Sequence, residues 1–172
     1  MIKTIQEYDD LLKTKLSNKR YEHSIQVAKL AKELAKYNDV NEDKAYVAGL
    51  LHDITKELDE DIQDSILKKH HDLDKLNTKT SIKHSYTAKY YLMDELNIDD
   101  DDILDAVYNH TICKSNKPLS KIIYIADKRE ENRHIDDDIV EIAKNDLDKA
   151  FKLLCLDVYK YLKDKGEKCT IF

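Results

Sequence analysis

Apolar residues recur along this chain at helical rather than strand spacing. Over residues 2–16, five apolar side chains fall three or four positions apart, and Ser17 and Asn18 then interrupt the pattern. Spacings of three and four place side chains on one face of an α-helix. The pattern therefore predicts a first helix over about residues 2–16.

Two more helices are predicted before the middle of the chain. The stretch 20–38 carries an apolar stripe that includes His23 near its start, so this histidine is expected to face inward. Asn41 is a suitable N-cap for a third helix that runs to about Thr55. The dipeptide His52-Asp53 is expected in the last turn of that helix.

The helical pattern continues through the second half of the chain. The expected elements are a short helix over 59–70, a loop over 70–83, a helix near His84, a helix that includes 103–110, a helix from Pro118 to Asp127 and a long helix over about 136–165. No segment alternates between apolar and polar positions as a half-buried strand would.

Composition supports an all-α fold. The 172 residues contain only two glycines and one proline, which leaves few residues suited to tight turns and favours long helices. A chain of this length is of ordinary size for one domain with a buried core. We therefore expect residues 1–172 to form a single all-α domain.

Charge and cysteine content limit the classes of function. Charged residues make up 37% of the chain with both signs interleaved, which is typical of solvated helix faces, and the net charge of −6 does not favour nucleic acid as a partner. No segment approaches the roughly 20 apolar residues of a membrane span. Cys113, Cys155 and Cys169 are far apart in sequence, so we expect reduced thiols in a cytoplasmic protein.

Ligand-type residues end the apolar faces of five predicted helices. They are His23, His52 with Asp53, His84, His110 and Asp127. One inward histidine is usually explained by packing or by a helix cap, but a helical core gains little from four separate imidazoles. Imidazole nitrogens and carboxylate oxygens suit zinc, iron, manganese or nickel. The set therefore predicts a transition-metal site.

The six ligands divide into two sets that share Asp53. One metal ion would use His23, His52, Asp53 and Asp127, and a second would add His84 and His110 to a bridging Asp53. Two ions about 3.5–4 Å apart hold a hydroxide and polarise a phosphoryl oxygen. This arrangement predicts hydrolysis of a phosphate ester or anhydride.

The ordered ligands resemble a known superfamily. The series His23, His52-Asp53, Asp127 is similar to the HD-domain metal-dependent phosphohydrolases, and His84 and His110 resemble the additional ligands of its dinuclear branch. The blocks "RYEHSIQVAKLAKELA", "AGLLHDITK", "HSYTAKYYL", "AVYNHT" and "IIYIADKREENR" resemble successive motifs of the bacterial YqeK family over about residues 18–134.

This resemblance implies both a fold and an activity. The expected fold is the all-α HD domain, and the expected reaction splits diadenosine tetraphosphate symmetrically into two ADP, by attack of a metal-activated hydroxide on phosphorus. Iron is the metal associated with the family, and zinc, manganese and nickel are alternatives. Glu131 stands where the family usually has proline and Ile112 where it usually has threonine, which affects the expected shape of the substrate pocket.

The resemblance also suggests residues that contact substrate. Asp53 and Lys56 are the expected catalytic residues, and Arg20, Lys56, Thr111 and Arg133 are the expected contacts to phosphate. For the three basic residues the alternative is an exposed cation or a surface ion pair, and for Thr111 it is a helix-end cap. Glu130 would orient Arg133 or a ligand, or would be solvated. His70, His71 and His134 are expected at the surface.

Three other functions remain open from sequence. A different HD phosphohydrolase acting on another nucleotide would have the same ligands, and the segments "HTICKSNKP" and "DKREENR" favour the tetraphosphatase. A nucleotide-binding sensor without turnover is a second alternative, and a structural helical bundle that binds no metal is a third. A homodimer is also left open, because the predicted helix over 136–165 is apolar over more than one narrow stripe.

Overall fold

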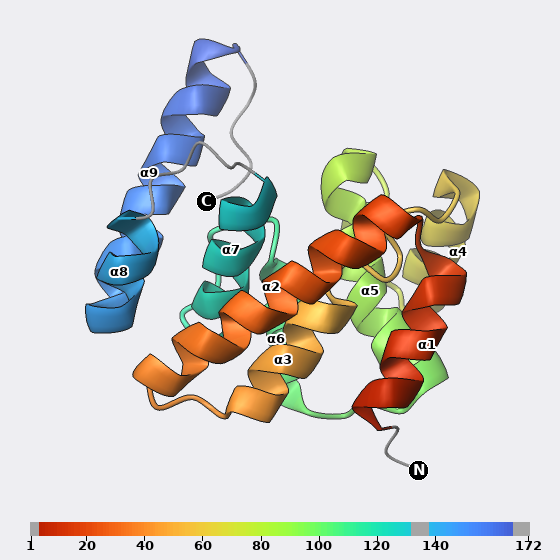
Figure 1. Cartoon of the computed structure of the whole chain (residues 1–172). Helices are drawn as coiled ribbons and strands as arrows, with labels where there is room; N and C mark the ends of the chain where they lie inside the picture. Colours follow the sequence, from red (N-terminus) through yellow and green to blue (C-terminus); the bar gives the residue numbers. More distant parts are fainter. Residues whose placement is uncertain (1–3, 132–137, 167–172) are drawn as a thin grey trace.

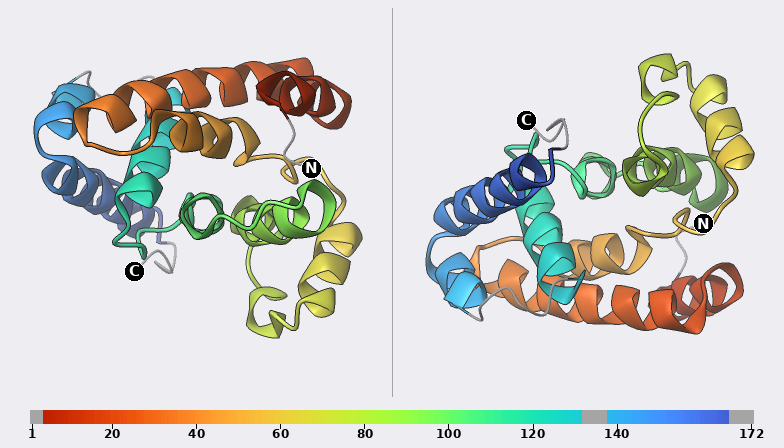
Figure 2. Two further views of the ribbon diagram at one scale, coloured as in Figure 1. Left: turned by 90° about the horizontal axis from the view of Figure 1, so that it is seen from below. Right: turned by 90° about the horizontal axis from the view of Figure 1, so that it is seen from above.

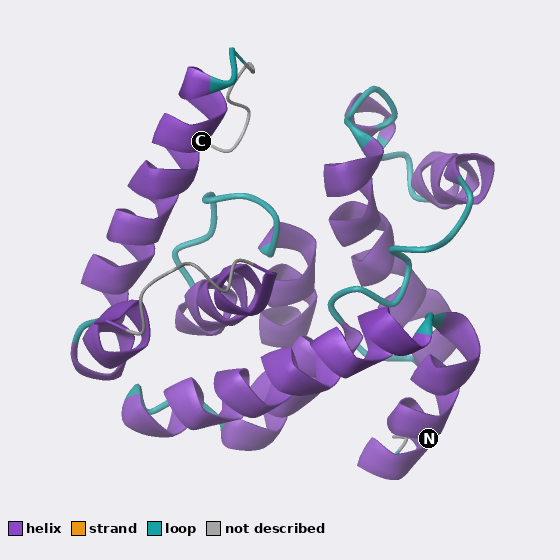
Figure 3. Ribbon diagram, turned by 45° about the horizontal axis from the view of Figure 1, so that its top comes forward, coloured by secondary structure: helices purple, strands orange, loops and turns teal. Residues whose placement is uncertain are grey.

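The computed structural model describes residues 4–131 and 138–166. Every regular element in these residues is helical, which confirms the all-α class (Figure 3). The elements are α1 (Ile5–Lys15), α2 (Asn18–Tyr37), α3 (Glu42–Leu51), α4 (Glu60–Lys69), the 3₁₀ turn η1 (Leu73–Lys75), α5 (Thr80–Leu96), α6 (Asp101–Asn109), α7 (Pro118–Glu131), α8 (Asp138–Asn145) and α9 (Leu147–Asp164). None of the helices in this part of the chain has the length and hydrophobicity of a membrane span.

The helices are arranged around one main hydrophobic core. The long helix α2 crosses the molecule in Figure 1 and packs along α3 and α7, while α6 contacts α3, α5 and α7. In Figure 2, α2 and α3 lie on one side of the molecule and α4 and α5 on the other. Helices α8 and α9 contact each other, and α8 packs against α2 and α9 against α7. The helices that carry the predicted ligands thus share a single interior.

A glycine allows α2 and α3 to pack closely. A Cβ atom added to Gly49 would lie 2.8 Å from the Cα atom of Ala28 in α2, which is closer than real Cβ atoms approach backbone. Since the neighbouring atoms belong to helix backbone, they cannot move aside as a flexible side chain would. The absence of a side chain at Gly49 therefore helps to bring His52, three residues later, near His23 of α2, with ring centroids 5.4 Å apart.

The observed helix ends refine the predicted ones. Asn41 caps α3 as expected, because its side chain accepts a hydrogen bond from the backbone N–H of Lys44 at 2.9 Å. The helix ends at Leu51 rather than near Thr55, so Asp53 lies in the turns after the helix instead of in its last turn. The predicted loop over 70–83 was too long, because α5 already begins at Thr80 with a polar first turn.

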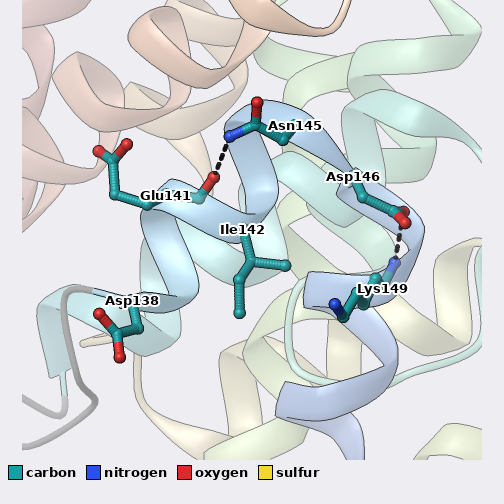
Figure 4. Close-up of a pocket in the computed structure, with 6 residues that line it drawn as sticks. All are labelled: Asp138, Glu141, Ile142, Asn145, Asp146 and Lys149. Carbon is teal, nitrogen blue, oxygen red and sulfur yellow. Dashed lines mark hydrogen bonds between the residues drawn. The ribbon is translucent and has the colours of Figure 1, made fainter.

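The predicted long helix over 136–165 was wrong in one respect. Residue 136 lies outside the described residues, and the remainder forms two helices, α8 and α9, that meet at Asp146. Asp146 has non-helical backbone angles, and its carboxylate accepts a hydrogen bond from the N–H of Lys149 at 2.9 Å (Figure 4). An aspartate in this position starts a new helix, but the apolar periodicity continues across it and hides the break.

The expectation of reduced thiols was also wrong for two cysteines. A disulfide joins Cys113, in the segment after α6, to Cys155 of α9. The two residues are 42 positions apart in sequence, and only the packing of α9 against α7 brings them together. Sequence spacing cannot report such a long-range contact. Cys169 lies outside the described residues.

Candidate metal centre

Six predicted ligands converge in one buried cluster. They are His23 of α2, His52 and Asp53 after α3, His84 of α5, His110 after α6 and Asp127 of α7. All except His23 are at most 2% exposed. Their donor atoms form three overlapping groups, each within 4.8 Å: His23 with His52 and Asp53, His52 with His110 and Asp127, and Asp53 with His84 and His110.

Backbone carbonyls orient the imidazole rings. The Nδ1 atom of His52 lies 2.6 Å from the carbonyl oxygen of Gly49, and Nδ1 of His110 lies 2.7 Å from that of Val107. A carbonyl only accepts hydrogen bonds, so each Nδ1 carries the proton and the lone pair of Nε2 faces the cluster. Nδ1 of His84 makes a longer contact of the same kind, 3.4 Å to the carbonyl of Thr80.

The donor atoms fit a bound transition metal. Nε2 of His84 lies 3.0 Å from Nε2 of His110, although both atoms should present lone pairs. Nε2 of His52 is buried and has no hydrogen-bond partner among the described residues. Converging lone pairs beside two carboxylates need a positive charge, and imidazole with carboxylate suits a divalent transition metal. The residues present therefore fit the ions implied by the sequence.

Asp53 lies between the two predicted ligand sets. Its Oδ1 atom is 3.0 Å from Nε2 of His84 and 3.5 Å from Nε2 of His110. Its Oδ2 atom is 3.5 Å from Nε2 of His52 and 4.0 Å from Nε2 of His23. Each carboxylate oxygen therefore faces a different pair of histidines, which is the geometry that a bridging carboxylate requires.

Asp127 has a basic neighbour that sequence analysis missed. Its Oδ1 atom lies 3.1 Å from Nε2 of His23, and its Oδ2 atom lies 2.9 Å from Nζ of Lys128. Burial acts to raise the pKa of Asp127. Lys128, and to a smaller extent His23 and His52, nevertheless hold this pKa well below its ordinary value. Lys128 stands in the charged run "DKREENR", where it resembles a solvated residue. The signal available in sequence was its adjacency to a predicted ligand.

Two predicted basic residues border the same cluster. The guanidinium NH1 atom of Arg20 lies 2.9 Å from Oδ2 of Asp53, and Nζ of Lys56 lies 3.2 Å from Nε2 of His84. Together with Lys128, they place three cationic groups around the two carboxylates. This local positive charge contrasts with the net negative charge of the chain and suits an anionic ligand.

Buried hydroxyl groups support the helices that carry the ligands. Thr55 donates a hydrogen bond to the backbone carbonyl of His84 at 2.8 Å and lies 2.9 Å from the hydroxyl of Thr87. The hydroxyls of Ser85 and Thr111 are 2.9 Å apart, which connects α5 to the segment after His110. Thr111 therefore contacts another protein group rather than the cluster, and Thr55 is a further supporting residue that sequence analysis did not identify.

The remaining candidate residues are placed less directly. Glu130 lies on α7 and is half-buried. Arg133 and His134 lie outside the described residues. His71 is exposed, as predicted. His70, predicted at the surface, is partly buried: its ring stacks on Tyr90 and its Nε2 atom lies 2.9 Å from a carboxylate oxygen of Asp94.

The pKa values of the cluster reflect competition between burial and charge. Burial lowers the pKa of His84 to about 4, despite the opposing attraction of Asp53, and burial also lowers the pKa of His110. Burial acts to raise the pKa of Asp53, but His52, His110 and His84 hold it well below its ordinary value. These shifts favour neutral His84 and His110 beside an ionised carboxylate, which are the protonation states that a metal requires.

We expect the metal-free protein to lose stability as the pH falls from 6.5 towards 4. In that window the unfolded chain binds a proton at His84 that the folded chain excludes, because the folded pKa is about 4 against an ordinary 6.5. The contribution of His84 is fully present above the unfolded pKa and amounts to about 3 kcal/mol. The prediction is checked by urea unfolding of wild type and His84→Asn at several pH values.

The comparison between variants isolates the effect of His84. Burial acts to lower the pKa of His52, but Asp53 and Asp127 raise it overall, so His52 stabilises the fold below its folded pKa in both proteins. The free energy of unfolding should therefore decrease more steeply in wild type than in His84→Asn. Equal slopes would contradict the prediction, and His71→Asn, at an exposed histidine, should match wild type.

Comparison with known proteins gives a consistent assignment. The HD domain family profile matches residues 20–132. The "Bis(5'-nucleosyl)-tetraphosphatase, symmetrical" of Bacillus subtilis (strain 168) is 32% identical, with 91% of this chain and 86% of that protein covered. The protein of the same name from Halalkalibacterium halodurans has the same identity and coverage.

A longer relative and a crystal structure also match. The "Probable nicotinate-nucleotide adenylyltransferase/Ap4A hydrolase" of Mycoplasma genitalium is 34% identical over 89% of this chain, which spans only 46% of that protein. The crystal structure of a predicted HD superfamily hydrolase involved in NAD metabolism from Clostridium acetobutylicum is 30% identical, with a TM-score of 0.87 over 98% of this chain and 92% of the other. The chain therefore belongs to the HD domain family and is an HD-domain hydrolase related to the proteins named symmetrical bis(5'-nucleosyl)-tetraphosphatases.

Proposed function

We propose that this protein splits diadenosine tetraphosphate symmetrically into two ADP with the help of two bound metal ions. The observation that carries the proposal is the position of Asp53, whose two oxygens face different pairs of histidines in one buried cluster. The names of relatives that are 32% identical over most of their length supply the substrate.

The ligand roles follow from this geometry. His23, His52, Asp53 and Asp127 would hold one ion, because each of the two histidines lies 3.1–4.0 Å from an oxygen of each of the two aspartates. Asp53, His84 and His110 would hold the other. Bound ions would supply charge stabilisation at phosphoryl oxygens and would lower the pKa of water to near neutrality. Iron is the proposed metal, and zinc, manganese and nickel satisfy the same donor atoms.

Basic residues would position the tetraphosphate. Lys56 is partly buried beside His84 and would neutralise a non-bridging oxygen of the substrate. Arg20 holds Asp53 through NH1, and its side chain is 24% exposed, which places it at the edge of the cluster, where it would contact a phosphate. Lys128 would keep Asp127 oriented through the carboxylate oxygen that faces away from His23.

Asp53 combines two tasks in this proposal. It joins the two metal positions, and through Arg20 and His84 it connects them to the groups that would hold phosphate. Thr111 and Arg133 are further proposed contacts to phosphate. We propose that residues 1–172 form one domain, because α8 and α9 contribute to the same hydrophobic core as the helices of the HD match. A homodimer and a cytoplasmic location remain predictions.

The test is product analysis with defined substrates. Protein purified without chelator is incubated with diadenosine tetraphosphate, and the nucleotides are separated by anion exchange. We expect ADP as the sole product, with two ADP formed per substrate consumed. In water enriched in ¹⁸O, one label should enter one of the two ADP molecules formed from each substrate.

The other outcomes distinguish the alternatives. AMP together with ATP would contradict symmetrical cleavage. Metal binding without turnover of this substrate would contradict the proposal. A panel of other nucleotides would then separate a different phosphohydrolase, which should hydrolyse one of them, from a sensor, which should bind one without hydrolysis.

A further inference from the structure

A disulfide lies close in sequence to the metal centre. Cys113 follows the proposed ligand His110 by three residues, and its partner Cys155 lies in the middle of α9. Cys155 is 4% exposed, whereas Cys113 is half-buried. The bond therefore connects the C-terminal helix to the segment that leads away from His110, and Cys113 is the more exposed of the two cysteines.

A pocket gives small molecules access to this bond. The pocket has a volume of about 460 Å³, and both cysteines line it together with Lys121, Asp148 and Lys152. Nζ of Lys121 lies 2.6 Å from Oδ1 of Asp148, and this ion pair is neutral overall. The net charge of the three side chains is therefore the single positive charge of Lys152. This net positive charge favours an anionic reagent and stabilises a departing thiolate.

Contacts connect the same disulfide to a second proposed ligand. The Sγ atom of Cys113 lies 3.1 Å from the hydroxyl of Tyr124, which is buried on α7 one turn before Asp127. A disulfide sulfur carries no hydrogen, so Tyr124 is the donor. Nζ of Lys128 lies 5.6 Å from the centre of the Tyr124 ring and 2.9 Å from Oδ2 of Asp127. The disulfide thus contacts Tyr124, and the ring of Tyr124 lies beside the lysine that pairs with Asp127.

We propose that the Cys113–Cys155 disulfide is an exchange site for a small anionic thiol, and that its reduction weakens the metal centre. The pocket admits the thiol, and loss of the bond frees α9 from the segment after His110. Disulfides of proteins in reducing compartments are usually transient and redox-sensing. The prediction for catalysis rests on the proposed hydrolase function, whereas the exchange chemistry does not.

The exchange proceeds in two balanced steps. A thiolate attacks the accessible sulfur of Cys113, a mixed disulfide forms there, and Cys155 leaves as a thiolate that takes up a proton. A second thiolate attacks the sulfur of the small thiol in the mixed disulfide, and Cys113 leaves and is protonated. The protein disulfide gains two electrons and two protons, and two small thiols are oxidised to one disulfide.

The first experiment measures the exchange itself in the full chain. Oxidised protein is treated with glutathione, which is anionic, or with cysteamine, which is cationic, and free thiols are alkylated and counted by mass spectrometry. We expect two additional thiols, located at Cys113 and Cys155, and faster reduction by glutathione once the rates are corrected for thiolate concentration. The variant Lys152→Gln should slow glutathione about threefold or more and leave cysteamine unaffected or faster.

The second experiment measures the consequence for the protein. The disulfide closes a loop between residues 42 positions apart in sequence. Because opening a loop of this length increases the entropy of the unfolded chain, reduction is expected to lower the melting temperature by roughly 10 °C. It should also weaken metal retention during dialysis and lower kcat/KM by roughly tenfold, because small displacements of catalytic groups are costly. Cys155→Ala should resemble reduced wild type and should no longer respond to thiols, while Cys169→Ser should respond as wild type does.

Several results would overturn the proposal. Alkylation of Cys113 and Cys155 in protein never exposed to reductant would show that no disulfide forms. Reduction without a change in melting temperature or metal retention would remove the connection to the metal centre. If thiol counts and melting temperature respond as expected but neither form hydrolyses diadenosine tetraphosphate, the proposed function fails and the exchange site stands.

Discussion

Replacement of Asp53 by asparagine is expected to lower the rate of hydrolysis by roughly 10³-fold or more. The substitution keeps the shape of the side chain but removes the negative charge of the carboxylate. In wild type, Oδ1 of Asp53 lies 3.0 Å from Nε2 of His84, and Oδ2 lies 3.5 Å from Nε2 of His52. An amide binds a transition metal far more weakly than a carboxylate. The prediction is checked by kcat/KM for diadenosine tetraphosphate and by metal content of the purified variant.

A matched substitution separates this effect from general changes in charge. Asp61 is exposed on α4, away from the cluster, so Asp61→Asn should keep wild-type activity and metal content. Circular dichroism of Asp53→Asn should show an intact helical fold, because asparagine occupies the same volume. Retention by Asp53→Asn of more than about a tenth of wild-type activity would contradict a role in joining the two metal positions.

Removal of bound metal is expected to destabilise the protein by about 4 kcal/mol when metal had been present at about a thousand times its dissociation constant. The cluster buries two carboxylates and several imidazole lone pairs, and Nε2 of His84 and His110 lie only 3.0 Å apart. Without a cation these groups repel or lack partners. The melting temperature should therefore fall by roughly 10 °C after chelation and recover when iron(II) or manganese(II) is added.

Stoichiometry tests the two-site arrangement independently of activity. Elemental analysis should find two metal ions per wild-type chain and about one in His84→Asn, because only one of the two ligand sets depends on this residue. His71→Asn, at an exposed histidine, should retain two. A protein that binds no transition metal and shows no metal-dependent change in melting temperature would contradict the two-metal proposal and favour a purely structural bundle.

Much of the fold and the ligand set could be predicted from local sequence patterns. Helical periodicity depends on residues three and four positions apart, so it located the helices and showed that His23, His84 and His110 follow apolar faces. The N-cap at Asn41 was predictable for the same reason, because a cap bonds to a backbone group three residues away. The order of the ligand motifs along the chain was sufficient to indicate the HD family.

Tertiary structure decided what depends on contacts between distant residues. Only the folded chain shows that Asp53 faces two pairs of histidines, that Lys128 holds Asp127 and that Thr55 holds the backbone at His84. It also joined Cys113 to Cys155 and divided the last predicted helix at Asp146. Sequence patterns determined which side of each helix is buried, but the meeting of side chains from different helices depends on how those helices pack.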